Sequence, residues 1–355
     1  MKEIVLITGG AGFIGSHTAD ALAKRGYKIR ILDNLEPVVH RSKWPKYVLG
    51  KGYELVRGDV RLKRDWQNAL RGVSYVYHIA AYQDQRPDFS KFFHTNTVGA
   101  SLLYEVAAEK KLPLKKVVIA GTQFVYGDGL YRCAHGQNVY GSEFYADLRA
   151  ENDFNRGRWD ILCPHGKPAK FLPFREDQES QPPNAYALSK LAAEKLALRF
   201  GKTHKIPTTV LRYSIVQGPR QSPHNLYSGA IRIFMTQALS GKPITVYEDG
   251  MQARDFVNIK DVVAANLLVL KNKKTDFGIY NVGGGKACRI FDFAKIVKRL
   301  AGSTTSIKIG DFRRTDTRHA VSDISKLKKL GWKPRFTPED SVREYLRWYK
   351  EEFLR

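Results

Sequence analysis

Two residue types that together can move a proton stand four positions apart in the stretch NAYALSKLAAEK, residues 184–195. Because positions i and i+4 share one face of a helix, Tyr186 and Lys190 would present a phenol and an ammonium to the same point. A tyrosine ordinarily titrates at about 10, and a neighbouring cation stabilises the phenolate and lowers that pKa. Tyr186 is therefore a candidate general base, activated by Lys190. The same spacing also occurs where a tyrosine at a helix start packs on the core beside a solvated lysine.

A glycine-rich turn near the start of the chain could hold a phosphate group. TGGAGFIG, residues 8–15, follows the apolar run IVLIT and has glycines at 9, 12 and 15. This spacing permits a tight turn, a close approach of the backbone to a pyrophosphate, and helix N–H groups that face the anion. The next apolar run, KIRILD, ends in Asp33, a carboxylate placed to accept hydrogen bonds from ribose hydroxyls and to repel a 2'-phosphate.

These residues predict bound NAD rather than NADP, with a positive nicotinamide ring that would lower the pKa of Tyr186 further. The expected binding residues in this part of the chain are Gly9, Gly12, Phe13, Ile14, Asp33 and Asn34.

The elements that must position these groups alternate along the first half of the chain. Short apolar runs (EIVLIT, KIRILD, YELVRGD, VSYVYHIA, KKVVIAG) are separated by amphipathic stretches. Strand and helix in turn predict an α/β fold, a Rossmann-type doubly wound parallel sheet with a smaller C-terminal α/β lobe. We expect the first domain to cover residues 1–217 plus about 254–282, and the second lobe about 218–253 and 283–355. Residues 128–183, rich in Gly, Pro, Asn, Tyr and Arg, are expected to form a long loop insertion.

Composition narrows the class of protein. Subtracting 35 acidic from 59 basic residues gives a net charge of +24, but no nucleic-acid-binding signature accompanies this charge, which we interpret as a solvated surface. No apolar run reaches the roughly eighteen residues that span a bilayer. Three cysteines and a strand-like start favour a reducing cytoplasm over secretion. Neither nucleic acid nor a membrane is expected as a partner.

Several motifs in one order resemble a known family. They are TGGAGFIGSH at 8–17, DN at 33–34, GDV at 58–60, HIAA at 78–81, NTVGASLL at 96–103, VYG at 125–127, YALSK at 186–190, LRY and GPRQ within 211–221, RDFV at 254–257 and DISKLKKLGWKP at 323–334. The chain resembles the extended short-chain dehydrogenases/reductases of the NAD-dependent epimerase/dehydratase family, which act on nucleotide sugars. The resemblance is to the UDP-glucose 4-epimerase-like members, and the GLYR start of the insertion resembles a dTDP-L-rhamnose 4-epimerase-like subgroup. It implies that Asp59 and Val60 flank the adenine, that Ala80 and Ala81 line the cofactor groove, and that Asn96 supports the nicotinamide side.

The resemblance also implies a reaction. Thr122 of AGTQFVYG is in register with the hydroxyl residue that aligns the reacting sugar oxygen between Tyr186 and the cofactor. Dehydratases and decarboxylases that resemble this chain place an acid shortly after that residue, whereas here Gln123, Phe124 and Val125 follow. The absence of a carboxylate favours 4-epimerisation, with a dehydratase or 4-keto reductase as the alternative. A non-catalytic NAD-sensing or nucleic-acid-binding Rossmann protein is the alternative from another class.

The second lobe is expected to bind the nucleotide-diphosphate sugar. Arg254 of RDFV and Arg313 of RRTD match positions that grip the substrate diphosphate in the family, and Asn225 matches a contact to the nucleotide base. The chain departs from the family pattern at Ile215, where many relatives carry an asparagine. Substrate contacts at that position must therefore differ.

Two further features carry open interpretations. CAHG and CPHG, within the insertion, could bind zinc through Cys133, His135, Cys163 and His165, although the one-residue gaps are tighter than usual and ordinary loop residues are the alternative. The family resemblance implies a homodimer through helices near 97–110 and 186–200. The apolar stripe Ala193, Leu196, Ala197 and Phe200 would fit that contact or would face the core.

Overall fold

The computed structural model describes residues 2–84, 86–133, 142–147, 149–223, 229–310, 312–313 and 316–354. Two predicted site residues, His135 and Asn225, lie outside the described residues. No helix in the described ranges is long and apolar enough to cross a membrane.

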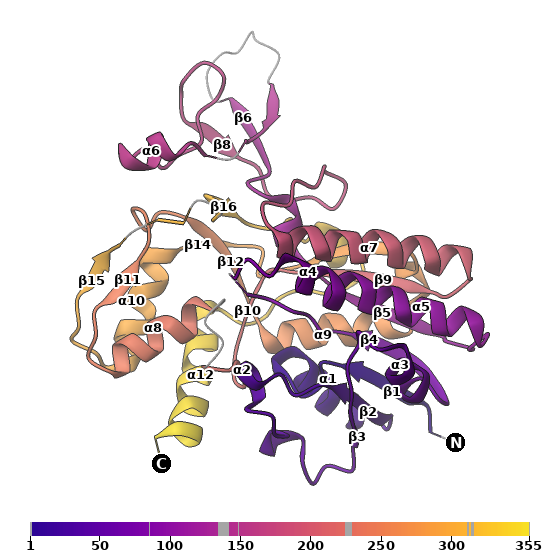
Figure 1. Cartoon of the computed structure of the whole chain (residues 1–355). Coiled ribbons are helices and arrows are strands. Elements are labelled where there is room, and N and C mark those ends of the chain that lie inside the picture. The colour runs from indigo at the N-terminus through magenta and orange to yellow at the C-terminus, as the bar shows by residue number, and fades with distance from the viewer. Residues whose placement is uncertain are drawn as a thin grey trace.

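A seven-stranded parallel sheet forms the frame of the larger lobe (Figure 1). Its order is β13-β9-β5-β4-β1-β2-β3, and every neighbouring pair is parallel. The strands are β1 (Ile4–Thr8), β2 (Lys28–Asp33), β3 (Glu54–Arg57), β4 (Val73–His78), β5 (Lys116–Thr122), β9 (Thr208–Tyr213) and β13 (Gly278–Val282). The predicted Rossmann-type sheet is confirmed. Its strand order reverses between β1 and β4, where parallel sheets of this kind bind ligands at their carboxyl ends.

Helices cover both faces of this sheet because its strands are apolar on both sides. Along β1, Val5 and Ile7 join one buried cluster while Leu6 joins the other. The first face packs against α1 (Phe13–Ala23) and α9 (Ile259–Leu270), and the second against α3 (Lys63–Ala69), α5 (Gly99–Glu109) and α7 (Ala185–Thr203). Short helical pieces complete this lobe: α2 (Pro37–His40), η1 (Lys46–Val48), α4 (Phe89–Phe92), the π-helix η2 (Phe93–Val98), η3 (Gln123–Tyr126) and η4 (Lys273–Thr275).

The apolar stripe on α7 faces the sheet over most of its length. Ala193 and Ala197 are buried, and Leu196 packs against the second cluster. Phe200, in contrast, is 38% exposed, as are Leu188 at 47% on the same helix and Val98 at 40%. The core interpretation therefore holds for three of the four stripe residues, namely Ala193, Leu196 and Ala197.

A second lobe surrounds a separate core. β12 (Ala253–Asn258) pairs with β10 (Ile215–Gln217), β14 (Ala287–Arg289) and β16 (His319–Ala320), and β11 (Ile244–Val246) pairs with β15 (Ile307–Ile309). Three helices, α8 (Ala230–Leu239), α10 (Ile290–Ala301) and α12 (Pro338–Phe353), bury their apolar faces in one cluster with β11 and β12. The short α11 (Ser325–Lys328) packs back toward β13. Ile215, the departure from the family pattern, packs against this cluster. The exact domain boundaries stay a prediction.

The insertion differs from the expected loop. It contains a three-stranded antiparallel sheet, β7 (Glu143–Tyr145), β6 (Leu130–Cys133) and β8 (Ala169–Phe171), together with α6 (Glu151–Asn155). In Figure 1 this small sheet projects from the body of the molecule. Strands of three or four residues are too short for alternation to be recognised in the sequence, so the loop prediction was wrong for these segments.

Candidate active site

A cavity of about 290 Å³ opens at the carboxyl ends of β1 and β2. The predicted cofactor residues that line it are Gly9, Gly12, Phe13, Ile14, Asp33, Asn34, Val60, Ala80 and Ala81. Asp59 of the predicted set is not among the lining residues; Arg61, which is, donates to its carboxylate from Nε at 2.9 Å and Nη2 at 2.6 Å. The Asn34 amide also donates to Asp59, at 3.2 Å. The structure thus gathers residues from four separate strand ends around one hollow.

The glycine turn leaves no room for side chains. Gly9 has φ of +66°, and a Cβ there would lie 2.8 Å from Cα of Ala80. A Cβ on Gly15 would lie 2.3 Å from the carbonyl oxygen of Gly9, so the helix packs directly on the turn. No side chain caps the start of α1 at Gly12. The uncapped first-turn N–H groups fit a phosphate group in this cavity.

Asp33 is buried at the end of β2. Its carboxylate accepts hydrogen bonds from the backbone N–H groups of Ala11 at 3.1 Å and Leu35 at 2.9 Å. Burial raises the pKa of Asp33, and the nearby His40, 4.0 Å away, and the two amides oppose that shift. Since a carboxylate has about four acceptor sites, Asp33 keeps capacity for ribose hydroxyls.

The three predicted catalytic residues come from two elements. Thr122 ends β5, and the side chain of Asn184 caps the N-terminus of α7 by accepting from Ala187 N–H at 2.9 Å. This cap starts the helix so that Tyr186 and Lys190 lie on successive turns, and both side chains are buried together with Thr122. The hydroxyls of Tyr186 and Thr122 share a hydrogen bond. Tyr186 also packs against Tyr82, which lines the cofactor cavity.

Burial has the largest effect on the pKa values of Tyr186 and Lys190. Burial raises the pKa of Tyr186 to about 12, and the hydrogen bond from Thr122 opposes this shift. This value describes the protein without a dinucleotide, so the lowering predicted for Lys190 together with the positive nicotinamide ring stays a prediction. Burial also lowers the pKa of Lys190 to about 8, and Glu194 opposes that change. Activation of the phenol therefore requires a further positive charge in the site.

Lys190 has capacity for a ligand. Among the described residues, its ammonium makes no hydrogen bond or ion pair. The nearest acid, Glu194, is engaged by Arg212, whose Nε donates to it at 2.9 Å and whose Nη2 donates to its other oxygen. A buried ammonium without a protein partner fits the ribose hydroxyls of a bound dinucleotide.

Asn96 is buried in η2 and fixes the backbone beside this site. Its carbonyl oxygen accepts from Tyr82 N–H at 2.8 Å, and its amide donates to Ser189 Oγ at 2.9 Å on α7. Asn96 therefore ties η2 to Tyr82 and to α7, and its support of the nicotinamide side stays a prediction.

The two predicted diphosphate-binding arginines lie in the second lobe. The Arg254 guanidinium donates to the backbone carbonyls of Ala253, Thr317 and Arg318 at 3.0, 2.8 and 3.1 Å. Arg313 donates to Tyr247 Oη at 3.2 Å and stacks over that ring. Both arginines act on the buried Asp316, where burial raises the carboxyl pKa and the two cations oppose that shift. The structure thus brings the arginines toward one point, and their role toward a diphosphate stays a prediction.

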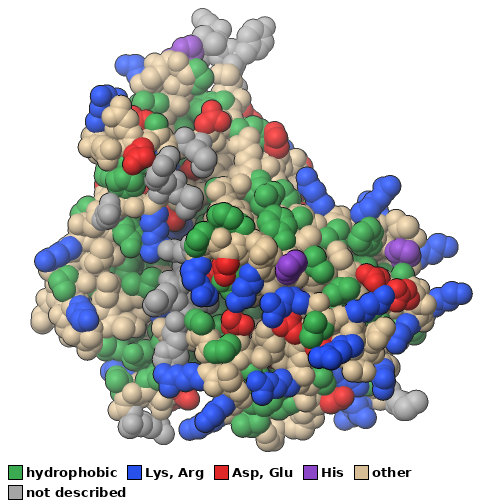
Figure 2. Space-filling model, in the orientation of Figure 1, with side chains coloured by type: hydrophobic (Ala, Val, Ile, Leu, Met, Phe, Trp, Pro, Cys, Tyr) green, Lys and Arg blue, Asp and Glu red, His purple; other side chains and the backbone are tan. Residues whose placement is uncertain are grey.

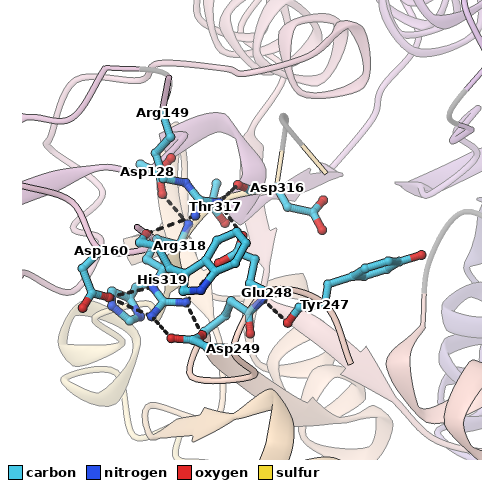
Figure 3. A network of polar contacts seen from close by, with 12 residues as sticks. Asp128, Arg149, Asp160, Tyr247, Glu248, Asp249, Asp316, Thr317, Arg318 and His319 are labelled. Atoms are coloured by element: carbon cyan, nitrogen blue, oxygen red, sulfur yellow. Dashed lines mark hydrogen bonds and ion pairs between the residues drawn. The ribbon is translucent and has the colours of Figure 1, made fainter. Parts of the chain in front are cut away.

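A buried ion-pair network joins this lobe to the insertion (Figure 3). The Arg318 side chain, 2% exposed, donates to Glu248 at 3.0 Å and to Asp249 at 2.7 and 2.8 Å. It also donates to Asp160 of the insertion at 2.9 Å. Arg149, likewise from the insertion, donates to Glu248 at 2.7 Å. The insertion is therefore docked on the second lobe by charged groups, which no sequence motif had indicated.

The structure also places residues in the cofactor cavity that the sequence did not single out. His40, Tyr47 and Arg220 line it. Arg220 donates to Asp20 at 2.8 Å and stacks over the Tyr47 ring. The GPRQ motif contained Arg220, but its position beside the glycine turn depends on contacts between segments about 200 residues apart.

Of the four predicted zinc ligands, the structure brings two together. The sulfurs of Cys133 and Cys163 lie 3.2 Å apart, and His165 is exposed two residues beyond Cys163. Among the described residues, no group of three or more His, Cys, Asp and Glu is arranged to hold a metal.

Comparisons with known proteins agree with this geometry. The sequence profile described as "NAD dependent epimerase/dehydratase family" matches residues 5–145 and 163–283. A dTDP-L-rhamnose 4-epimerase from Burkholderia thailandensis is 31% identical over 99% of this chain and 96% of its own length. A putative UDP-glucose 4-epimerase from Methanocaldococcus jannaschii is 29% identical over 98% of both chains. The crystal structure of the Thermus thermophilus UDP-glucose 4-epimerase in complex with NAD has a TM-score of 0.78 and 28% identity, covering 98% of this chain and 99% of that one. The chain therefore belongs to the NAD-dependent epimerase/dehydratase family, as its motifs predicted.

Proposed function

We propose that the protein is an NAD-dependent nucleotide-sugar 4-epimerase, an isomerase of carbohydrate metabolism. The observation that carries this proposal is the buried Thr122–Tyr186 hydrogen bond, with Lys190 one turn away and the tyrosine in contact with the wall of the dinucleotide cavity. Relatives that cover nearly the whole chain are named 4-epimerases, which supports the same reaction.

The cavity residues fit NAD, which when bound would accept a hydride from sugar C4 and return it to the opposite face. Gly9, Gly12 and the uncapped start of α1 would hold the pyrophosphate, and Asp33 the adenosine ribose. The Lys190 ammonium would donate to the second ribose. It would also stabilise the Tyr186 phenolate together with the positive nicotinamide ring.

The chain's own residues supply the proton transfer. Tyr186 would take the proton from the C4 hydroxyl and later return it, and Thr122, already hydrogen-bonded to the phenol, would hold the same sugar oxygen. The pKa of about 12 for Tyr186 in the protein alone implies that the base forms only when the dinucleotide is in place. Proton abstraction would thereby be coupled to the presence of the hydride acceptor.

Epimerisation is favoured over dehydration by the residues after Thr122. Gln123 and Val125 are buried, and Gln123 Oε1 accepts from Ser322 Oγ at 3.3 Å. Neither side chain can enolise a keto sugar, and the buried acid closest to Lys190, Glu194, is paired with Arg212. A dehydratase would need a further acid–base group that these positions do not provide, whereas a 4-keto reductase would be recognised by a net change in NAD(H).

The substrate is expected to be a nucleotide-diphosphate sugar. Arg254 and Arg313 would hold the diphosphate and Asn225 the base, with the two arginines drawn together by Asp316. The named relatives act on dTDP- and UDP-sugars, so both nucleotides belong in the test.

We further propose a cytoplasmic homodimer. Val98 at the end of η2 and Leu188 and Phe200 on α7 are exposed apolar residues within the segments where the family resemblance predicts the contact. The compartment is proposed from the cysteine content of the chain, three residues in 355.

The decisive experiment incubates the protein with a panel of UDP-, GDP- and dTDP-sugars and follows the configuration at C4 by NMR. Tyr186→Phe should lower turnover by about 10²–10⁴-fold with NAD content unchanged, and Tyr280→Phe, a buried tyrosine on the far strand β13, should leave turnover unchanged. Loss of water or solvent exchange at C5 would instead identify a dehydratase. Unchanged turnover in Tyr186→Phe would identify a protein whose chemistry does not use this site.

A further inference from the structure

The loop that carries Arg313 has no helix or strand in its described residues, 312–313 and 316–318, which we call the Arg313 loop. It lies between β15 and β16 of the second lobe. Asp316 N–H donates to the carbonyl of Arg313 at 3.1 Å, which closes one turn. The stability of such a segment depends on the contacts that other elements make with it. The position of the Arg313 guanidinium is therefore set by the groups that hold this loop.

One end of the Arg313 loop rests on aromatic rings of the insertion. Phe312 and the buried Phe154 of α6 stack face to face, with ring centroids 4.5 Å apart and an interplanar angle of 7°. Trp159 packs against both rings, with centroids 5.9 Å from Phe154 and 6.2 Å from Phe312. Stacking of this kind adds to the apolar contact and fixes the relative position of the rings. The insertion thereby holds the residue directly before Arg313.

Arg149 of the insertion holds the other end of the loop. Its Nη2 donates to the carbonyl of Asp316 at 2.7 Å as well as to the carboxylate of Glu248 (Figure 3). Its Nη1 donates to the carbonyl of Trp159 at 3.2 Å, and its guanidinium lies over the Phe154 ring, 4.5 Å from the centroid. The side chain is 5% exposed. One buried guanidinium thus joins the aromatic rings of the insertion to the backbone of the Arg313 loop.

The same loop also places the second arginine of the predicted diphosphate site. Arg254 donates to the backbone carbonyls of Thr317 and Arg318. The backbone N–H of Arg318 in turn donates to the carboxylate of Asp128, at the start of the insertion. A guanidinium binds phosphate oxygens in a fixed fork geometry, so a small shift of the loop would misalign both arginines. The position of Arg313 and of Arg254 therefore depends on contacts from the insertion.

We propose that Arg149 and Phe154 are positioning residues for the diphosphate of the nucleotide sugar. They would hold the Arg313 loop so that Arg313 and Arg254 meet the same ligand. This inference rests on the proposed function, since it takes a nucleotide diphosphate as the ligand of the two arginines. Affinity for the diphosphate would depend on the docked insertion, and by linkage a bound diphosphate would strengthen the docking. Arg149 and Phe154 would act through the loop and not on the reacting atoms.

The first test measures the affinity of the NAD-loaded protein for UDP and for dTDP by calorimetry. Phe154→Ala and Arg149→Met should each weaken binding at least about fivefold, with NAD content unchanged. Arg158→Met is the matched control, because this side chain of the insertion is 58% exposed, and it should bind like wild type. With a nucleotide sugar, Phe154→Ala and Arg149→Met should raise KM and leave kcat within about twofold of wild type.

A double-mutant cycle separates positioning from general support of the fold. If Phe154 acts through Arg313, Phe154→Ala should have little further effect on UDP affinity once Arg313→Met is present. Additive losses from these two substitutions would overturn the inference, because they would show that Phe154 acts elsewhere. Wild-type affinity in both Phe154→Ala and Arg149→Met would overturn it as well.

A further measurement uses the wild-type insertion, so that it does not depend on the folding of an insertion variant. Hydrogen exchange within residues 149–161 should become slower when UDP is added, and Arg313→Met should abolish this effect. Equal exchange with and without saturating UDP would refute the coupling. A protein that shows the coupling but converts no sugar would refute the epimerase proposal and support this one. A wild type that binds none of UDP, dTDP and GDP would refute both.

Discussion

The buried ammonium of Lys190 gives a prediction that joins stability to catalysis. Burial lowers its pKa from 10.5 to about 8 in the protein alone. At about 1.36 kcal/mol for each pKa unit, that difference corresponds to about 3 kcal/mol of destabilisation at neutral pH, where the lysine is charged. Methionine has a similar shape and no charge. Lys190→Met should therefore raise the free energy of unfolding of the dinucleotide-free protein by up to about 3 kcal/mol, while abolishing turnover.

The pH dependence identifies the cause. Because the folded-state pKa of Lys190 lies below the unfolded-state value, the unfolded chain binds the extra proton between about pH 8 and 10.5. The stability of the wild type, compared with the variant, should therefore rise with pH across this window. The gap of about 3 kcal/mol at pH 7 should close toward zero near pH 10.5.

Urea unfolding at a series of pH values measures this gap. The matched control is Lys195→Met, an exposed lysine on the same helix, which should change stability by less than about 0.5 kcal/mol. This prediction fails if Lys190→Met is no more stable than wild type at pH 7, or if the difference in stability between the two does not depend on pH. Either result would show that the protein already stabilises the buried ammonium. With NAD bound, the wild type should gain more stability than the variant, because only the lysine can donate to the ribose.

Three other substitutions test the rest of the site. Thr122→Val should lower kcat by about 10²-fold with NAD content unchanged, measured by steady-state kinetics; an unchanged kcat would mean that the hydroxyl does not hold the sugar oxygen. Gly9 has φ of +66°, and Gly9→Ala would place a Cβ 2.8 Å from Cα of Ala80. Calorimetry should therefore show an NAD affinity at least about tenfold weaker than that of the wild type. An unchanged affinity would contradict the turn geometry. Arg318→Met leaves the carboxylate of Glu248, which is 1% exposed, with fewer partners. The free energy of unfolding should fall by about 3–5 kcal/mol, and hydrogen exchange in residues 142–171 should become faster. Adding Glu248→Gln to Arg318→Met should recover part of the lost stability. Equal exchange in wild type and Arg318→Met would show that the network does not dock the insertion.

The parallel sheet could be predicted because the same alternation of apolar and amphipathic segments repeats along the first half of the chain. Five apolar runs separated by amphipathic stretches predict alternating strands and helices, and such units have right-handed crossovers. The glycine turn and Asp33 indicate the end of the sheet at which a ligand would bind. Figure 2 agrees with the interpretation of the charge. On the face shown, Lys and Arg side chains are spread over the lower half of the molecule, with Asp and Glu among them.

Other features depend on contacts that local sequence does not encode. The strands of the insertion are too short to show a period, and the partners of Arg318 come from separate segments of the chain. Spacing on a helix gives the position of a cation but not the extent of burial, and it is burial that raises the pKa of Tyr186 in the protein alone. The sequence of α7 likewise does not show whether its apolar stripe faces the core or a second subunit. The packing of Ala197 in the second buried cluster shows that this part of the stripe faces the core.

The insertion, residues 128–183, lies between the two residues whose hydroxyls are proposed to act in catalysis. Thr122 precedes it and Tyr186 follows it, and their hydrogen bond closes the loop at its base. Within the same stretch of chain, the buried Phe174 stacks on Tyr126 with ring centroids 4.8 Å apart. Because doubling the length of a closed loop costs only about 0.6 kcal/mol, the segment between these anchors is free to grow, shrink or be exchanged. A transplanted segment of different length should therefore leave the Thr122–Tyr186 pair in register.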